Sequence, residues 1–314
     1  MQTAQPESAD AVRTTPVKPL VSVGLPVFNG ERYLEQALDS LLRQTFEDFE
    51  LVISDNGSTD RTPEICRSYA ARDERIRYLR EETNRGASWN FGKVFLETSA
   101  PLFRWASHDD LYEPTHLERC VDVLSHAPAA VVLCYPKTRL IDGDGQSLGV
   151  HEDRLDLRDP IPARRLRRLV ANVVYVNALF GLIRREALTR TRLLQAFLGS
   201  DWVLLAELAL LGQFWEIPEP LFLRRLHDEM SMRANPTPRA LAAWFDPAAS
   251  RQGNRVLCHL LGQHLAAIHR APLPLATKST LYPALMGVWL KRHRRGMACE
   301  LLPDSLARRL RPTT

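Results

Sequence analysis

Two adjacent carboxylates follow an apolar segment in the first half of the chain. Asp109 and Asp110 come directly after PLFRWASH (101–108), which has the composition of a buried strand. Like charges repel, and a hard divalent cation such as Mg²⁺ or Mn²⁺ relieves the repulsion by binding carboxylate oxygens while keeping positions free for phosphate oxygens. The pair therefore indicates a metal site, and two solvated acids in a turn are the alternative.

Two further polar blocks precede this pair. SDNGSTD (54–60) places Asp55 at the end of an apolar run, with Gly57 for a tight turn, and TNRGASWNFG (83–92) places Asn84 before a helical pattern. Each block by itself is also typical of turn and helix-capping chemistry. Neither a G-x-x-x-x-G-K-[ST] nor a G-x-G-x-x-G motif follows the first apolar run, which argues against P-loop and dinucleotide sites.

The elements that must position these residues alternate between two periodicities. Apolar runs typical of strands alternate with segments whose apolar residues recur at the helical period. Such alternation predicts a mostly parallel sheet with helices on both faces. Because ligands bind beyond the carboxyl ends of parallel strands, we expect the three polar blocks to meet at one edge of the sheet. The expected strands are 21–28, 49–55, 75–80, 101–108 and 129–136, and the expected helices are 31–44, 60–72, 87–98 and 113–126.

The second half of the chain is less regular. Its pattern predicts a hairpin, two helices, a strand entering a further helix, a two-part extended segment and several C-terminal helices. The expected positions are a hairpin at 138–149, a helix at 165–172, a strand entering a helix at 176–188, a helix at 200–212, extended chain at 214–227, and helices from 237 onward with breaks near 272–274 and at Pro283.

Bulk composition excludes several classes of protein. Hydrophobic residues make up 45% of the chain and charged residues 25%, which is typical of a globular domain. Five widely spaced cysteines without a C-x-x-C pair argue against a disulfide framework and a structural zinc site. We find no secretory signal and no run of about 18 apolar residues, so we expect a cytoplasmic protein that is not integral to a membrane.

The charge is distributed unevenly. Residues 237–314 hold twelve Lys and Arg against three Asp and Glu, whereas the rest of the chain is mildly acidic. This basic part is either a solvated surface, a dimerisation surface, or a contact with anionic membrane lipids through KRHRRG (291–296). Its aromatic residues are not interleaved with the basic cluster, which argues against a nucleic-acid partner.

Three blocks in a fixed order carry a resemblance to a known family. PVFNGERYLEQALDSLLRQTFEDFELVISDNGSTDRT (26–62), NRGASWNFG (84–92) and SHDDLYEP (107–114) resemble the family 2 glycosyltransferases with the GT-A fold, and a looser resemblance continues to about residue 231. The resemblance implies an α/β GT-A domain with a mostly parallel central sheet. It also implies inverting transfer of a sugar from a nucleotide diphosphate donor to an acceptor hydroxyl, with Mn²⁺ or Mg²⁺ as cofactor.

The resemblance also assigns residues to the donor nucleotide. Asp55 would accept the N–H of the base, which suits uracil or thymine and favours a UDP- or dTDP-sugar. The other residues that would surround base and ribose are Pro26, Val27, Phe28, Glu31, Asn84 and Arg85.

The diphosphate and the metal would be held by a second group. Asp109 matches the last acid of the family's D-x-D motif, whose first acid is replaced here by Ser107. Asp110 and His227 would share the metal with Asp109, and Arg225 would neutralise the leaving diphosphate.

One acid at a helix start would act as the base. The resemblance places Asp201 there, in GSDWVLLAELAL, to deprotonate the acceptor hydroxyl as it attacks. A capping role for Asp201 is the alternative, and both roles can coexist.

The resemblance divides the chain into three parts. We expect a disordered tail at 1–19, a GT-A domain at 20–236 and a basic helical extension at 237–314. Within the domain, 20–136 would bind the nucleotide and 137–236 a saccharide or lipid-linked acceptor, in the synthesis of a bacterial cell-surface polysaccharide or glycolipid. The replacement of an acid by Ser107 leaves a non-catalytic nucleotide-sugar-binding protein as a second hypothesis, and a nucleotidyltransferase is a third.

Overall fold

The computed structural model describes residues 18–247 and 255–302. The expected disordered tail at 1–19 therefore lies almost entirely outside the described residues. No helix within the described ranges has both the length and the apolar character needed to cross a lipid bilayer.

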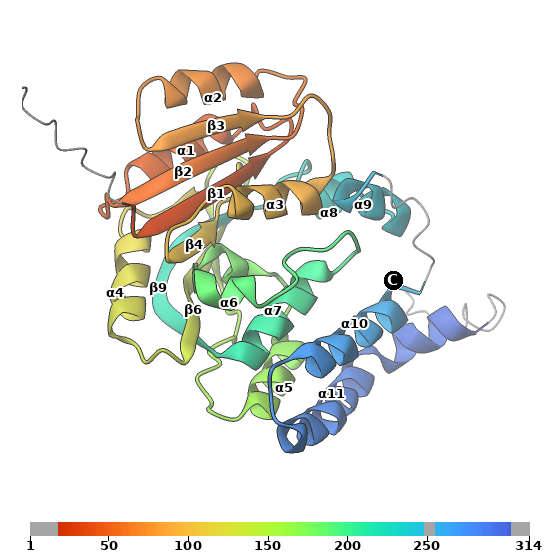
Figure 1. Cartoon of the computed structure of the whole chain (residues 1–314). Coiled ribbons are helices and arrows are strands. Elements are labelled where there is room, and N and C mark those ends of the chain that lie inside the picture. The colour runs from red at the N-terminus through yellow and green to blue at the C-terminus, as the bar shows by residue number, and fades with distance from the viewer. Residues whose placement is uncertain (1–17, 248–254, 303–314) are drawn as a thin grey trace, which may run out of the picture.

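A single sheet with the strand order β3-β2-β1-β4-β8-β6-β9-β5 forms the centre of the molecule, and β7 pairs with β6 (Figure 1). The first four strands in this order are parallel to each other, as the alternating pattern predicts. Antiparallel pairs enter with β8, β7 and β5. The strands are β1 Val21–Val27, β2 Phe49–Asp55, β3 Ile76–Arg80, β4 Leu102–Trp105, β5 Leu111–Tyr112, β6 Val131–Ile141, β7 Ser147–His151, β8 Leu182–Arg184 and β9 Gln213–Arg225.

Helices cover both faces of this sheet and bury two hydrophobic cores. One core lies under α1, α2 and α4, and the other lies under α3, α5 and α7 and continues into α10 and α11. The α/β architecture and the helical C-terminal region are thus confirmed. The helices are α1 Leu34–Leu42, α2 Thr62–Ala70, α3 Ala87–Leu96, α4 His116–His126, α5 Pro162–Asn172, the 3₁₀ turn η1 Asn177–Phe180, α6 Arg185–Thr189, α7 Ser200–Leu211, α8 Ser231–Ala234, α9 Pro238–Phe245, α10 Val256–Arg270 and α11 Leu275–Leu301.

Two details differ from the expectation. Pro283 does not break the last helix but lies inside α11. The buried side chains of Leu281, Leu285 and Trp289 hold this helix against its neighbours, so packing outweighs the local cost of the proline. The expected boundary between residues 136 and 137 lies within β6, which continues to Ile141 because it pairs with β9 on both sides of a register shift.

The C-terminal helices are attached to the sheet domain rather than separate from it. α11 packs along α5, and α10 packs against α7 and α11 (Figure 1). The Glu207 carboxylate of α7 accepts a hydrogen bond from the Arg270 guanidinium at the end of α10, over 2.9 Å. The same carboxylate accepts the backbone N–H of Arg192, also over 2.9 Å. Glu207 therefore joins α10 to the loop before α7.

Candidate active site

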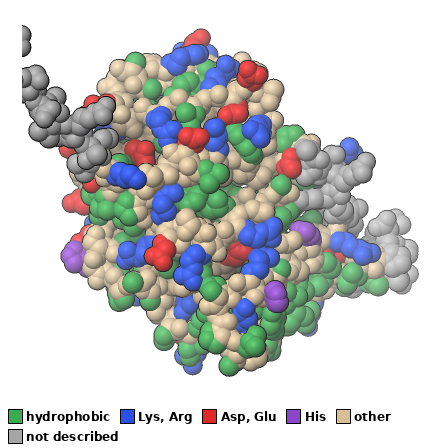
Figure 2. Space-filling model, in the orientation of Figure 1, with side chains coloured by type: hydrophobic (Ala, Val, Ile, Leu, Met, Phe, Trp, Pro, Cys, Tyr) green, Lys and Arg blue, Asp and Glu red, His purple; other side chains and the backbone are tan. Residues whose placement is uncertain are grey.

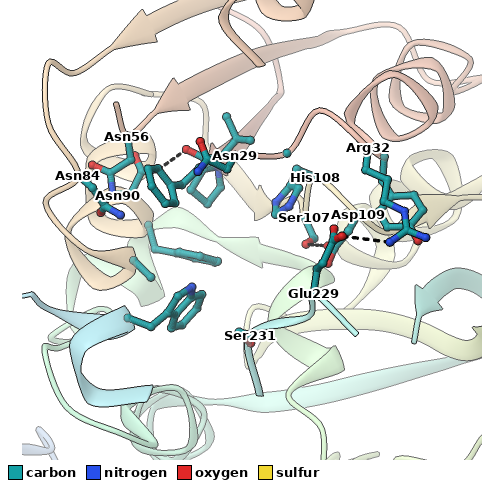
Figure 3. A pocket seen from close by; sticks show the side chains of 18 of the residues that line it. Asn29, Arg32, Asn56, Asn84, Asn90, Ser107, His108, Asp109, Glu229 and Ser231 are labelled. Carbon is teal, nitrogen blue, oxygen red and sulfur yellow. Dashed lines mark hydrogen bonds and ion pairs between the residues drawn. The ribbon is translucent and has the colours of Figure 1, made fainter. Parts of the chain in front are cut away.

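A cavity of about 230 Å³ lies beyond the carboxyl ends of β1 and β4, next to the start of α3 (Figure 3). Gly30 forms part of its wall, and a Cβ there would lie 2.7 Å from the His108 ring, so only glycine allows this close approach. The three polar blocks meet here, as the parallel strands predict. Of the residues expected from the sequence, those that line the cavity are Pro26, Val27, Phe28, Asn84, Ser107, Asp109 and His227.

Three amide side chains form one end of this cavity (Figure 3). Asn56 donates to Asn84 Oδ1 over 2.9 Å. Asn90 Nδ2 donates to the carbonyl oxygens of Val27 and Ser54, over 3.3 and 2.9 Å. Because both partners are carbonyls, the nitrogen of the Asn90 amide must face them, and its Oδ1 is left buried without a hydrogen-bond partner. A buried unpartnered acceptor in a cavity wall is a place where a ligand N–H can bind.

Asp55, expected to meet the base, is not among the residues that line the cavity. Its side chain is fully buried and accepts hydrogen bonds from the Tyr78 hydroxyl and the Ser58 backbone N–H, both over 2.8 Å. Arg80 forms an ion pair with it at 3.4 Å. Successive residues of a strand point to opposite faces, so the next residue, Asn56, is the one that lines the cavity.

At the other end of the cavity, Asp109 is surrounded by groups that favour its charged form. The Ser107 hydroxyl donates to its Oδ1, and His227 Nε2 lies 2.9 Å from its Oδ2. Burial raises the pKa of Asp109, but the charge of His108 and the hydrogen bonds from His227 and Ser107 outweigh it and bring the pKa below its usual value. An ionised carboxylate therefore faces this part of the cavity.

The neighbouring acid is engaged elsewhere. Asp110 Oδ1 accepts the backbone N–H of Arg225 over 2.9 Å, and Asp110 does not line the cavity. Burial, reinforced by the charge of Asp109, raises the pKa of Asp110. The Arg225 guanidinium is also buried, and it donates to the carbonyls of Asp109 and Gly143 and to Gln36 Oε1, over 2.8 to 2.9 Å. Asp110 and Arg225 thus hold together the loop that carries Asp109.

Two other expected residues also lie outside the cavity lining. Glu31 Oε2 accepts the backbone N–H of Arg61 over 2.9 Å, which ties the loop after β1 to the start of α2. Arg85 lies over the ring of Trp89, 4.1 Å from its centroid. Both therefore support loops around the cavity.

The expected base lies in a second, adjoining cavity of about 320 Å³. Asp201 is in the first turn of α7, and the N–H of Trp202 donates to its Oδ1 over 2.9 Å. Burial raises the pKa of Asp201, although the Trp202 N–H and the charge of Arg224 oppose this. The residues that line both cavities are Ala87, Phe91, Ser231 and Trp244.

Several lining residues were missed by sequence reasoning. Asn56 was recoverable from its place directly after the strand that ends at Asp55, whereas Asn90 had been singled out with Asn84 as an amide at the start of a helix. Trp244 comes from the C-terminal extension, where no motif indicated a role. The exposed ion pair of Arg32 and Glu229, 3.1 Å long, closes one side of the cavity through residues that are 197 positions apart.

A divalent cation fits the residues at Asp109 in part. Within residues 18–247 and 255–302 no group of three or more His, Cys, Asp or Glu side chains could hold a metal by itself. The chemistry of the pair formed by Asp109 and His227 still suits a cation, because Mg²⁺ and Mn²⁺ commonly bind one or two protein ligands and take the rest from phosphates and water.

Solved structures with the same architecture bind nucleotide sugars. S. aureus TarS, solved in complex with UDP-GlcNAc, matches with a TM-score of 0.65 and 15% identity, covering 91% of this chain and 77% of that one. A mannosyltransferase of Pyrobaculum calidifontis, solved with GDP-Man and Mn²⁺, matches with a TM-score of 0.53 and 16% identity, covering 93% and 87%. At these identities the likeness is one of fold.

Sequence relatives cover part of the chain. An uncharacterized glycosyltransferase of Rickettsia typhi is 35% identical over 130 residues, which are 41% of this chain and 40% of that protein. Glycosyltransferase GlyG of Streptococcus pneumoniae is 28% identical over 114 residues, 36% and 38% of the two chains. The chain thus spans about two fifths of the length of these relatives. The family model described as Glycosyl transferase family 2 matches residues 22–191, more than half of the chain, so the protein belongs to this family.

Proposed function

We propose that this protein is an inverting glycosyltransferase that moves a sugar from a nucleotide diphosphate sugar to an acceptor hydroxyl. The observation that carries the proposal is the contact between two cavities: one is lined by amides and by the ionised Asp109, and the other contains Asp201. A donor sugar at the junction would have the leaving diphosphate on one side and the attacking hydroxyl on the other, which is the geometry that inversion requires.

The amide end of the first cavity suits a nucleobase. Phe28 offers an aromatic surface for stacking, and the unpartnered Oδ1 of Asn90 would accept an N–H from the base edge. Uracil and thymine carry such an N–H at N3, whereas cytosine does not. The proposal therefore keeps the preference for a UDP- or dTDP-sugar but moves the contact from Asp55 to Asn90. The complex of TarS with UDP-GlcNAc is consistent with it.

The opposite end suits a diphosphate and a cation. Asp109 and His227 would hold Mn²⁺ or Mg²⁺, which supplies charge to stabilise the leaving diphosphate. The complex of the Pyrobaculum mannosyltransferase with Mn²⁺ supports a cation in this fold. Asp110 and Arg225 would keep Asp109 in position through the contacts described above.

Asp201 would be the general base. Its burial raises its pKa, which increases its affinity for the proton of the acceptor hydroxyl. The acceptor would approach from the second cavity, opposite the diphosphate. The pathway that we propose is the synthesis of a cell-surface polysaccharide or glycolipid, and the relatives in Rickettsia and Streptococcus support a bacterial setting.

A calorimetric titration tests the donor site. UDP, dTDP, CDP, GDP and ADP are each titrated with Mn²⁺ and with EDTA. Binding of UDP or dTDP that depends on Mn²⁺, with CDP bound at least tenfold more weakly, is expected. Failure of every nucleotide to bind would contradict the proposal. Normal binding without transfer to any acceptor and without hydrolysis of a UDP-sugar would instead favour the non-catalytic binding protein.

We further propose that the C-terminal helices contact an anionic membrane surface. A groove between α5 and α11 is lined by five cations and by no acid among the described residues, namely Arg164, Arg167, Arg168, Lys291 and Arg292. Leu290, next to Lys291, is 44% exposed. In Figure 2 the region over α10 and α11 shows hydrophobic, basic and histidine side chains. Basic and apolar groups together suit a headgroup layer.

Vesicle sedimentation tests this contact. The double variant R167Q/K291Q is compared with R43Q/R67Q, which removes the same charge from exposed positions on the other half of the molecule. Vesicles with phosphatidylglycerol should retain the wild type and R43Q/R67Q but lose most of R167Q/K291Q. Equal retention by neutral phosphatidylcholine would contradict a contact that depends on anionic lipid. Retention by neither vesicle would remove the membrane role and leave a dimerisation surface or a solvated surface.

A further inference from the structure

The cavity that contains Asp201 has mostly apolar walls. Aromatic rings of Phe91, Trp202 and Trp244 and the side chains of several leucines and valines form them. Among the described residues that line it, Asp201 and Arg224 are the only charged ones. Drug-sized ligand sites commonly combine such walls with one or two polar groups that fix orientation.

Two of the other polar side chains in the lining, Ser88 and Arg224, have protein partners. The Ser88 hydroxyl donates to the backbone carbonyl of Phe245 over 2.9 Å. Arg224 donates to Asn177 Oδ1 over 2.8 Å and lies over the ring of Tyr175. The walls offer few polar groups for the several hydroxyls of an enclosed saccharide, and each unpaired hydroxyl weakens binding. Apart from Asp201, the cavity therefore suits hydrocarbon.

The C-terminal extension completes this cavity. Leu241 and Trp244 from α9 and Leu260 from α10 form its outer wall. Gly199, just before α7, has a φ of +80°, and a Cβ on it would lie 2.9 Å from Leu260, so glycine lets α10 approach the helix that carries Asp201. At the rim, Val174 is 59% exposed. The C-terminal extension thus forms part of a cavity wall, a role that no sequence motif in it indicated.

We propose that the acceptor is amphipathic: its hydrocarbon part fills this apolar cavity while its hydroxyl lies at Asp201, next to the donor sugar. The inference rests on the proposed function and specifies its acceptor class. The hydroxyl oxygen forms the new bond to the anomeric carbon, its proton passes to the Asp201 carboxylate, and the bond to the nucleotide diphosphate breaks. The apolar walls hold the acceptor so that these groups meet.

Two glycosides that differ only in chain length test the inference. Methyl and n-octyl β-D-glucopyranoside are titrated separately into the protein, the octyl compound below its micelle concentration. The octyl chain should bind about 100-fold more tightly, since several methylenes leave water. The emission of Trp202 and Trp244 should change with the octyl compound only. Equal affinity for both glycosides would overturn the inference.

Two variants test whether the octyl chain of the glycoside occupies this cavity. V174D puts a charge at the rim, and L194W fills the cavity; each should weaken octyl glucoside binding about tenfold or more. V150D is the matched control, because Val150 is 49% exposed on β7, away from the cavity lining. Equal affinity of all three variants for octyl glucoside would place the octyl chain elsewhere and overturn the inference.

Nucleotide titrations separate the proposed function from the inference about the acceptor. V174D and L194W should bind UDP as the wild type does, because Val174 and Leu194 do not line the first cavity, the proposed donor cavity that contains Asp109 and Asn90. If the wild type binds no nucleotide, the proposed function fails. If nucleotide binding is normal but no glycoside shows a chain-length effect, only the inference about the acceptor fails.

Discussion

His227 Nε2 lies 2.9 Å from Asp109 Oδ2, although 118 positions separate the two residues in the chain. The contact joins the end of β4 to the end of β9, so it forms only when both halves of the sheet are in place. It keeps an ionised carboxylate and an imidazole together at the end of the donor cavity where a diphosphate would lie.

The first prediction concerns this pair. D109N should abolish Mn²⁺-dependent UDP binding and reduce transfer by about 100-fold or more, because the variant removes the negative charge that a cation needs. Calorimetry with and without EDTA measures the binding. D228N is the control, since Asp228 is next to His227 but its side chain is 99% exposed. Unchanged Mn²⁺ dependence in D109N would exclude Asp109 as a ligand.

The second prediction separates binding from chemistry. D201N should lose about 100-fold or more of kcat while UDP binds within twofold of the wild type, because Asp201 lies outside the donor cavity. E186Q is a matched control, as Glu186 is also in the first turn of a helix. Full activity of D201N would exclude Asp201 as the base and leave it only the capping role at the start of α7.

The third prediction follows from the environment of Asp201. Burial raises the pKa of this carboxyl above its usual value of 3.8. A general base must be ionised, so kcat should fall as pH drops through the raised pKa, at a higher pH than for an exposed aspartate. The kcat of the wild type is measured across pH with saturating donor and acceptor. A rate that stays constant down to about pH 4 would contradict this assignment.

The fourth prediction concerns the C-terminal helices. Burial lowers the pKa of His264 from 6.5 to about 4, helped by the charge of His293 and opposed by the Leu260 carbonyl. The unfolded chain therefore takes up a proton below pH 6.5 that the folded chain refuses until about pH 4, and stability is lost as pH falls through this window. At pH 5 the loss should be roughly 2 kcal/mol relative to pH 7.5.

Urea unfolding at the two pH values measures this loss. H264Q should show a smaller change in unfolding free energy between pH 7.5 and pH 5 than the wild type, even if its absolute stability is lower. H126Q is the control, because the His126 side chain is 81% exposed and should leave the pH dependence as it is. The same slope in wild type and H264Q would show that His264 is not the group responsible.

The sequence by itself determined the elements and the edge of the sheet where chemistry occurs. Alternating strands and helices predicted the parallel part of the sheet, because a strand and a helix bury residues at different periods. Asp55, Asn84 and Asp109 were placed at one edge for the same reason, and of these Asn84 and Asp109 line the cavity. The order of three motifs indicated the family, which the match over residues 22–191 confirms.

The direction of each side chain was decided by tertiary structure. Asp55 and Asn56 are adjacent, yet one is buried against β3 and the other lines the donor cavity, because Tyr78 and Arg80 take up the carboxylate. Likewise Asp110 and Arg225 have the types expected of a metal and phosphate site, but the Asp110 carboxylate accepts the backbone N–H of Arg225, and the Arg225 guanidinium binds two backbone carbonyls and Gln36. Local patterns cannot specify such partners, since they come from distant segments.

The role of the C-terminal extension also depended on packing. Residues after 236 read as basic helices with a break at Pro283, whereas in the structure Trp244 reaches the donor cavity and α11 continues through the proline. Both outcomes arise from contacts between segments far apart in the chain, namely those of α9 with α3 and of α11 with α5. Local periodicity indicates which residues of a helix or strand are buried. Only the assembled fold determines which other elements cover them and which cavities remain between those elements.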